Sequence, residues 1–381
     1  MTKDPKGMSA LAQQGVMLPQ ESVLEVARVH KELFIGIPKE ISYEENRIPL
    51  VPESVGLLVS HGHRVLIETG AGVSANFTDS DYSEAGAQIA YSNKEVYKAD
   101  VVLKVAPPSL EEVEMMQHRQ SLFSILQIGM QQPGYVQQLS SKKITALAFE
   151  YLRDETDVYP VIQAMSEIVG STVILIASEL LSNTTGGKGE LLGGVPGIPP
   201  TKVVILGAGT VGEYAARAAL GLGANVKIFD NNIYKLRRVQ RNLGTRVYTS
   251  TLNPAELLKV LKTCDVAIGA LSGSAGRTPV VVTEEMVKSM KFGSVILDMA
   301  VEQGGNVVGS KLNETLNVNG VTIIGEGNIP SLLPMNASDL YAKNIQTLLY
   351  HLASKDGFKW EMEEEITKGS LIVLSGKKQI K

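Results

Sequence analysis

Short apolar segments alternate with helical stretches along the first third of the chain. The segment at residues 33–37 is the first of several runs with the length of a buried strand, and residues 52–61 and 135–140 have a helical period. Strands that alternate with helices are typical of a parallel sheet covered by helices. The pattern therefore predicts an α/β domain that follows a polar leader over residues 1–32.

The second half repeats this alternation after a long apolar helix. Residues 158–182 are apolar on more than one helical face, which predicts a buried helix that leads into a second domain. A loop rich in glycine and proline follows at 184–200, and a helix is expected at 211–222. Strands are expected at residues 202–206, 225–229, 266–270, 295–299 and 321–324. This order is typical of a doubly wound parallel sheet.

The C-terminal segment is expected to return to the first domain. A helical pattern over residues 338–353 is followed by two apolar runs around Thr367-Lys368-Gly369, which suggest a closing hairpin. We therefore expect an N-terminal domain of residues 33–157 plus 336–381, and a second, doubly wound domain of residues 158–335.

A glycine-rich turn follows the first strand of the second domain. It reads Gly207-Ala208-Gly209-Thr210-Val211-Gly212 and opens directly into a helix. Gly207 permits the tight turn, Gly209 lets a pyrophosphate approach the backbone, and Gly212 allows the helix to pack closely on the strand. The first helical residues, Thr210 and Val211, would direct their backbone N–H groups at the phosphates. The spacing predicts a dinucleotide site.

An acidic residue at the end of the next strand indicates which dinucleotide is bound. Asp230 lies 18 residues after Gly212, where a carboxylate can accept hydrogen bonds from both ribose hydroxyls. It would repel a 2′-phosphate, and Asn231 follows it where an arginine would favour NADP. The motif therefore favours NAD(H), and the basic residues nearby are interpreted as a solvated helix face.

Two further strand ends are candidates for the same site. A glycine-rich segment at 269–276 follows a strand, so Ala270 and Leu271 are expected to line the far side of the cofactor, with a plain loop as the alternative. Asp298 ends a core strand at the carboxyl edge of the sheet. Open α/β sheets bind ligands at this edge, so Asp298 is also a candidate.

Composition argues against several classes of function. The formal charge is −4 without a cluster of lysine and arginine, and aromatic residues make up 5% of the chain, so nucleic acid is not an expected partner. Cys264 is the single cysteine, which excludes an intramolecular disulfide and fits a reducing compartment such as the cytoplasm. The most apolar stretch, residues 168–177, is too short to span a bilayer. No metal site is expected.

Three strings resemble one known family. They are VVILGAGTVGEYAARAALGLGANVKIFD around the glycine turn, GIPKE-x5-NR near the start, and LDMAVEQGGN after the strand at 295–299. They resemble the family of alanine dehydrogenases and the α-subunits of proton-translocating NAD(P) transhydrogenases, and the likeness covers nearly the whole chain from Leu33. The resemblance implies two Rossmann-like, doubly wound parallel-sheet domains with a nicotinamide cleft between them, the N-terminal domain on the substrate side.

The alanine dehydrogenase branch supplies candidates for catalysis. The resemblance implies that Arg47 in ENRIPL holds the substrate carboxylate and that Lys104 in VVLKVAPP contacts its carbonyl. A guanidinium can grip a carboxylate bidentately and a lysine can polarise a keto group, although each could also be a surface cation. Gln127 stands where that family has its acid/base histidine, and Glu302 where it has an aspartate beside the nicotinamide.

The transhydrogenase branch resembles the C-terminal third of the chain. The string NGVTIIGEGNIPSLLPMNASDLYAKNIQTLL is similar to the soluble NAD(H)-binding component, in which hydride passes between two nicotinamides on neighbouring subunits. No general base is needed for that transfer, which fits the absence of the histidine. In contrast, the stretch RDETDVYPVIQAMSE is closer to the dehydrogenase type. Asn328 occurs in both branches and is implied to lie by the nicotinamide, or else to cap a loop.

Three functions follow from these observations. The first is an NAD(H)-binding α-subunit of a proton-translocating transhydrogenase, with separate membrane and NADP-binding subunits as partners and a peripheral place at the inner membrane. The alternative is a cytoplasmic dehydrogenase of L-alanine or a related 2-amino acid with a remodelled acid/base site, acting on a small keto or amino acid. The third is a non-catalytic NAD(H)-binding protein. The resemblance implies a homo-oligomer, either a dimer or a hexamer.

Overall fold

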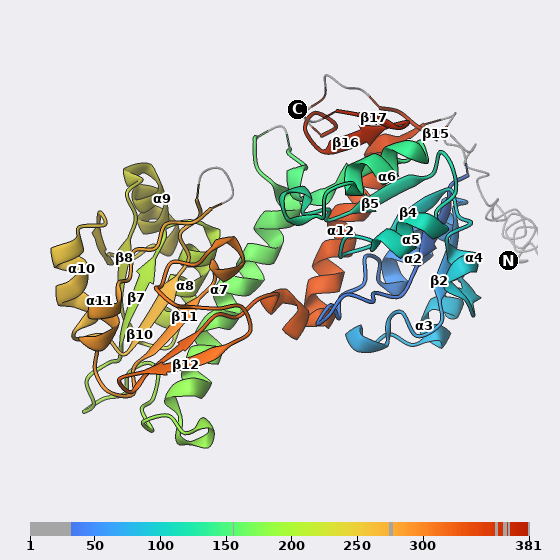
Figure 1. The fold of residues 1–381 in the computed structure, drawn as a ribbon. Helices are drawn as coiled ribbons and strands as arrows, with labels where there is room; N and C mark the ends of the chain where they lie inside the picture. Colours follow the sequence, from blue (N-terminus) through green and yellow to red (C-terminus); the bar gives the residue numbers. More distant parts are fainter. Residues whose placement is uncertain are drawn as a thin grey trace, which may run out of the picture.

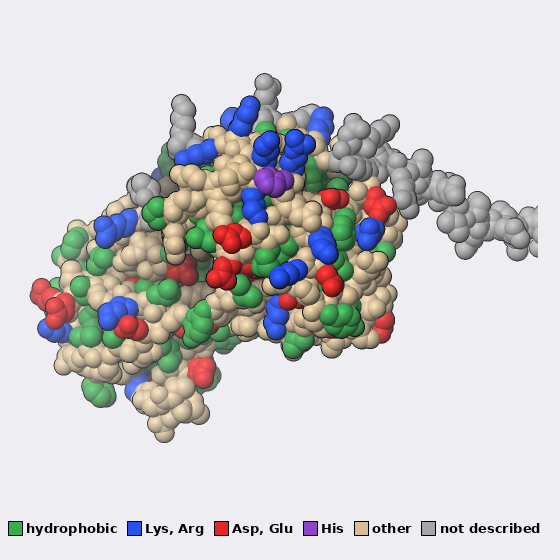
Figure 2. Space-filling model, turned by 45° about the vertical axis from the view of Figure 1, so that its right-hand side comes forward, with side chains coloured by type: hydrophobic (Ala, Val, Ile, Leu, Met, Phe, Trp, Pro, Cys, Tyr) green, Lys and Arg blue, Asp and Glu red, His purple; other side chains and the backbone are tan. Residues whose placement is uncertain are grey.

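The computed structural model has two lobes, each built on a sheet flanked by helices (Figure 1). It describes residues 32–379 apart from 155, 274–276, 355–356, 361–363 and 365. The leader predicted at 1–32 therefore lies outside the described residues, except for Glu32. Figure 2 shows hydrophobic, basic and acidic side chains mixed over one face of the molecule.

The first lobe contains a sheet of eight strands in the order β17-β16-β6-β5-β4-β1-β2-β3. Its six N-terminal strands pair in parallel. They are β1 (Phe34–Ile37), β2 (Arg64–Glu68), β3 (Gln88–Ala90), β4 (Val101–Leu103), β5 (Ser121–Ser124) and β6 (Thr145–Ala148). The helices of this lobe are α2 (Pro52–Ser60), α3 (Asp79–Glu84), α4 (Asn93–Val96), α5 (Leu110–Met115), α6 (Tyr135–Ser141) and α12 (Pro334–Leu352).

The C-terminal strands complete this first sheet. β16 (Leu371–Leu374) pairs antiparallel with β6, and β17 (Lys377–Lys378) pairs with β16. The hairpin turn is Ser375-Gly376, not the predicted Thr367-Lys368-Gly369. Both residues of the observed turn have positive φ, 48° and 85°, which is the backbone conformation that two-residue hairpins prefer. A small sheet of β14 (Ala353–Ser354) and β15 (Gly357–Phe358) precedes them.

The second lobe contains a sheet of seven strands in the order β12-β13-β11-β10-β7-β8-β9. Every pair is parallel except β12 with β13. The strands are β7 (Lys202–Leu206), β8 (Asn225–Phe229), β9 (Tyr248–Ser250), β10 (Val266–Gly269), β11 (Val295–Asp298), β12 (Thr315–Val318) and β13 (Val321–Ile324). The helices are α8 (Thr210–Gly221), α9 (Ile233–Leu243), α10 (Pro254–Leu261) and α11 (Glu284–Lys288). The order reverses between β7 and β10, which creates a crevice at their carboxyl ends.

One helix belongs to both lobes. α7 (Pro160–Leu181) packs Val161 and Met165 into the core of the first lobe, and Val173 and Leu181 into the core of the second. By length and composition it could cross a membrane, but this double packing accounts for the buried part of its apolar surface. We propose that the domains divide as expected, at 33–157 plus 336–381 and 158–335, with α7 shared by the two cores.

α7 crosses α8 at a glycine. A Cβ atom added to Gly170 would overlap the carbonyl oxygen of Val211 and the side chain of Tyr214. The close approach of these two helices therefore depends on the absence of a side chain at this position.

We predict that Gly170→Ala lowers the free energy of unfolding by about 1–3 kcal/mol, because the added methyl group must push α7 away from α8. Gly221→Ala is the matched control, since a Cβ there meets no atom within 4 Å. The control should be neutral or stabilising by up to about 1 kcal/mol. Chemical denaturation measures both, and equal stabilities would contradict the predicted contact.

Candidate active site

The glycine turn between β7 and α8 has two positions with no room for a side chain and one position with free space beside it. A Cβ on Gly207, whose φ is +121°, would overlap the carbonyl oxygen of Ala270, and a Cβ on Gly212 would overlap that of Gly207. A Cβ on Gly209 would meet nothing within 4 Å. Gly209 therefore faces open space next to the first turn of α8, where the N–H groups of Thr210 and Val211 have no helical carbonyl partner. The turn suits a pyrophosphate.

Asp230 is held rigidly at the carboxyl end of β8. Its Oδ2 accepts a hydrogen bond from Ala208 N at 2.8 Å, and its Oδ1 accepts one from Asn232 N at 2.7 Å. Each oxygen keeps a lone pair for a further donor. Asp230, Asn231 and Leu271 line a cavity of about 610 Å³ beside the glycine turn. This arrangement suits the adenosine half of NAD(H), with the carboxylate at the ribose.

Asp298 does not face a ligand, contrary to our expectation. Its side chain is fully buried and accepts hydrogen bonds from Asn306 N (2.8 Å), Val307 N (3.0 Å) and Ser310 Oγ (2.6 Å), as well as from Ala300 N. The carboxylate satisfies the backbone of the loop that follows β11 and so fixes its shape.

Asn306 has a related role, and no motif in the sequence identifies it. Its Oδ1 accepts a hydrogen bond from Leu271 N at 2.9 Å, and its Nδ2 donates to Pro279 O at 3.1 Å. Asn306 therefore positions the segment after β10 that lines the adenosine cavity.

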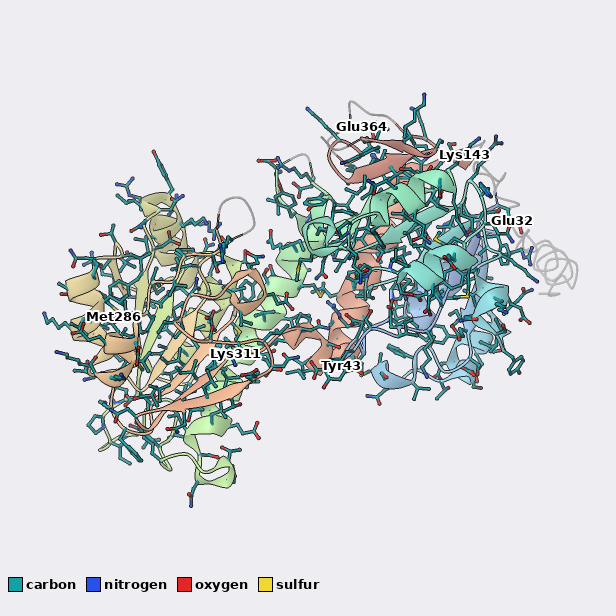
Figure 3. All side chains as sticks on the ribbon, viewed as in Figure 1. Glu32, Tyr43, Lys143, Met286, Lys311 and Glu364 are labelled. Atoms are coloured by element: carbon teal, nitrogen blue, oxygen red, sulfur yellow. The ribbon has the colours of Figure 1, made fainter. Side chains whose placement is uncertain are left out.

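A second cavity, of about 440 Å³, lies between the two lobes. Four of the predicted residues line it, namely Arg47, Gln127, Glu302 and Asn328. Its apolar wall comes from Val105, Ala106, Pro107, Ile125, Val169 and Met299. Figure 3 shows Tyr43 on the N-terminal lobe and Lys311 on the facing lobe, where the two lobes approach each other.

Arg47 is buried in this cavity wall and paired with Glu45. Nε and Nη2 donate to the two oxygens of Glu45 at 2.8 and 2.6 Å, and Nη1 lies 3.5 Å from the sulfur of Met165. Burial disfavours both charges, but the pairing outweighs it: the pKa of Arg47 is raised and that of Glu45 is lowered. One edge of the guanidinium is therefore occupied, and a ligand carboxylate can use only the remaining N–H groups.

Asn328 connects the two lobes. It follows β13 with a φ of +43°, and its Nδ2 donates to Glu45 Oε2 at 3.1 Å and to Glu44 O at 3.3 Å. Ser331 Oγ accepts from Asn46 N at 2.7 Å. These bonds hold the loop that carries Arg47 against the segment after β13, so Asn328 is a structural bridge at the cavity as well as a lining residue.

Lys104 does not reach the cavity, which corrects the expectation that it contacts a substrate carbonyl. Its side chain is fully buried, with Nζ 3.1 Å from Glu40 Oε2 and 2.9 Å from Glu112 Oε1. Burial would lower the pKa of Lys104, but the two carboxylates outweigh it and raise that pKa. Burial raises the pKa of Glu40 to about 7. The ammonium joins β4 to α5 and to the segment after β1, and residues 105–107 line the cavity in its place.

Gln127, which stands where the resembling family has its acid/base histidine, lines the cavity. It has a φ of +45°, and its backbone N donates to Glu150 Oε1 at 2.7 Å. Burial raises the pKa of Glu150, which is held by backbone N–H groups. An amide cannot exchange a proton near neutral pH, and the described residues that line the cavity include no histidine or lysine.

Two carboxylates of the cavity have no hydrogen-bond or ion-pair partner among the described residues. Glu302 lies in the helical turn η6 (Val301–Gln303) and lines the cavity. Glu326 was not predicted, although its position directly after the strand at 321–324, in the same loop as Asn328, is a signal that could have identified it. Burial, and then the charge of Glu44, raise the pKa of Glu326.

Comparisons with known proteins agree with this architecture. The domain family described as "Alanine dehydrogenase/PNT, N-terminal domain" matches residues 36–169, and "Alanine dehydrogenase/PNT, C-terminal domain" matches residues 173–381. Alanine dehydrogenase of Methanococcus maripaludis is 38% identical over 354 residues, 91% of this chain and 94% of that protein. Alanine dehydrogenase of Bacillus subtilis is 36% identical over 349 residues, 90% and 92% of the two chains.

Solved structures give the same result. An L-alanine dehydrogenase superposes with a TM-score of 0.82 at 37% identity and covers 90% of this chain and 96% of its own. A transhydrogenase from Sinorhizobium meliloti superposes with a TM-score of 0.80 at 27% identity, covering 91% and 99%.

Two parallel-dominated sheets, a glycine turn with an acidic partner and a cavity between the lobes define a two-domain, Rossmann-type dinucleotide-binding protein. Within that class, the chain belongs to the alanine dehydrogenase/PNT family.

We predict that Gly209→Ala weakens NADH binding at least about tenfold, because the methyl group occupies the open space over the turn. The free energy of unfolding of the apo-protein should change by no more than about 1 kcal/mol. Gly207→Ala should instead cost about 1–3 kcal/mol, since its backbone conformation and its contact both exclude a side chain. Fluorescence titration and denaturation measure the two effects, and unaltered NADH affinity in Gly209→Ala would exclude the proposed pyrophosphate position.

We predict that Lys104→Met lowers the free energy of unfolding by about 3–5 kcal/mol, because Glu40 and Glu112 remain buried without their cation. Lys259→Met, which removes an exposed ammonium, is the control and should be near neutral. A stable Lys104→Met protein that binds NADH normally but has lost turnover would instead support contact between Lys104 and a substrate.

Proposed function

We propose that this chain is a dehydrogenase of L-alanine or a related small 2-amino acid, with a remodelled acid/base site. It is an NAD(H)-dependent oxidoreductase of its family. The observation that carries the proposal is the cavity between the lobes, whose lining combines Arg47 with Asn328, Glu302 and an apolar wall. The alanine dehydrogenases listed above match this chain over nine-tenths of its length.

Each part of the cavity has a role in this proposal. Arg47 would bind the carboxylate of the amino or keto acid through its remaining N–H groups. The apolar residues at 105–107 would exclude water from the substrate carbon. Gly209 and Asp230 would hold the dinucleotide so that its nicotinamide end reaches Asn328 and Glu302. When bound, the nicotinamide accepts or donates the hydride.

A transhydrogenase subunit, the function that we expected first, is a second candidate. It is supported by the structural likeness to the Sinorhizobium meliloti protein and by the absence of histidine from the described residues that line the cavity. The alanine dehydrogenases have the higher identity, so the dehydrogenase is the better-supported proposal. Under it we place the protein in the cytoplasm as a homo-oligomer, whereas the second candidate adds a membrane partner.

The test is consumption of NADH by the purified protein with ammonium and a panel of small 2-keto acids that starts with pyruvate. We expect oxidation that requires both the keto acid and ammonium. Hydride transfer from NADH to an oxidised NADP analogue, without any keto acid, would favour the transhydrogenase subunit. NADH binding without turnover in either assay, from mildly acidic to alkaline pH, would reject the dehydrogenase. It would leave the transhydrogenase subunit, which needs its NADP-binding partner, and the non-catalytic binding protein.

We also predict that Arg47→Lys raises the KM for the keto acid at least about tenfold, because an ammonium cannot pair with Glu45 and a substrate carboxylate in the same plane. The Kd for NADH should stay within about twofold of the wild-type value, since the adenosine cavity is separate. An unchanged KM would show that Arg47 serves only to hold Glu45.

A further inference from the structure

The cavity between the lobes lacks a histidine and a lysine in its described lining, yet amino-acid oxidation requires a group that takes a proton from the substrate nitrogen. Gln127 cannot do this. Arg47 stays protonated, and Glu45 is committed to Arg47 and Asn328. Among the described residues of the lining, the carboxylates that remain as proton acceptors are therefore Glu302 and Glu326.

The backbone around Glu326 is fixed on both sides. A Cβ on Gly325 would overlap the carbonyl oxygen of Lys311, and a Cβ on Gly327 would contact Leu312 and lie 3.2 Å from Glu302 Oε1. A β-bridge joins Leu312 to Gly325. The two glycines let the chain pack tightly, so the residue between them is held in place in the cavity wall while its carboxylate has no partner among the described residues.

The charges around Glu326 come from three segments. The loop before α2 provides Tyr43, Glu44, Glu45 and Arg47, of which the last two neutralise each other. The turn η6 provides Glu302. On the neighbouring segment, Lys311 is paired with Glu314 at 3.1 Å. The net charge of these groups is negative. It favours the protonated form of Glu326 and would attract the ammonium group of an amino acid.

We propose that Glu326 is the proton-transfer residue of this cavity, which takes a proton from the substrate amino group and returns one to the departing amine. The inference rests on the proposed dehydrogenase function. Partial burial and the charge of Glu44 raise the pKa of this carboxyl, so its exchange of protons moves toward neutral pH. We assign the other carboxylate, Glu302, to the wall beside the nicotinamide.

The steps balance as follows. The Glu326 carboxylate removes one proton from the substrate ammonium, and a hydride with its electron pair passes from Cα to NAD⁺ as the nitrogen lone pair forms the C=N bond. Water adds to that carbon and releases one proton to solvent. Glu326 then protonates the nitrogen, and the C–N bond breaks as the hydroxyl oxygen forms the C=O bond. The hydroxyl proton passes to the departing ammonia, so the products are the keto acid, ammonium and NADH.

The test compares Glu326→Gln with Glu326→Asp and with the control Glu179→Gln, an exposed residue ten positions beyond Val169 on α7. Glu326→Gln should lower kcat about 10²-fold or more while the melting temperature and the Kd for NADH are retained. Glu326→Asp should recover part of the loss, and the control should match the wild type.

The pH profile distinguishes proton transfer from a structural role. Amino-acid oxidation needs the ionised carboxylate, so the wild-type rate should rise with pH through a midpoint above the ordinary carboxyl range. Reductive amination needs the protonated form and should fall through the same midpoint. In Glu326→Gln, both the rise of the oxidation rate and the fall of the amination rate with pH should disappear. A second readout uses the apo-protein: the infrared band of protonated carboxyl groups should lose a component in Glu326→Gln at a pH where an ordinary glutamate is ionised.

Two failures are distinguishable. If Glu326→Gln has the same activity and the same pH profile as the wild type, Glu326 is not the proton-transfer residue, but the proposed dehydrogenase function is unaffected. A wild-type protein that oxidises no amino acid and reduces no keto acid, although it binds NADH, would overturn both.

Discussion

The carboxylate of Glu45 is the interaction on which the geometry of the cleft depends. It accepts three hydrogen bonds from Arg47 in its own lobe, two from the guanidinium and one from the backbone N, and one from Asn328 in the other lobe. All three residues lie in the wall of one cavity. Without this carboxylate a guanidinium would be buried without its charge partner, and the amide that joins the lobes would lose an acceptor. The Glu45 side chain therefore links the substrate side of the cavity to its nucleotide side, beside the bonds that join Glu44 and Asn46 to the segment after β13.

Most of the fold could be predicted because the signals are local. Apolar runs of strand length identify β1 and β7, and the steric requirements of Gly207 and Gly212 are properties of one strand-to-helix turn. The C-terminal hairpin was misplaced because Gly369 looked like its turn, whereas the positive φ angles of the actual turn occur at Ser375 and Gly376. Two candidate turns close together in sequence cannot be ranked without knowing which strand pairs with β6.

The site could be predicted only in part, because its chemistry depends on partners that are distant in sequence. Arg47, Gln127, Glu302 and Asn328 do line one cavity. Lys104 and Asp298 also lie at strand ends and have side chains suited to a site, but both are already paired within the protein. Lys104 forms ion pairs with Glu40 and Glu112, and Asp298 accepts hydrogen bonds from the backbone of the loop that follows it. The sequence alone does not show whether a buried charged side chain is paired with other residues of the protein or is free to bind a ligand.

The helix that belongs to both cores has a mechanical consequence. Because α7 packs its first turns in one lobe and its last turns in the other, neither lobe can unfold fully without exposing apolar residues of the other. The two lobes are thereby joined into one cooperative unit even though each has a complete sheet. For the same reason, any opening or closing of the cleft must be absorbed by the segments at the ends of α7 or by a bend along it, since the helix cannot slide in one core without disturbing the other.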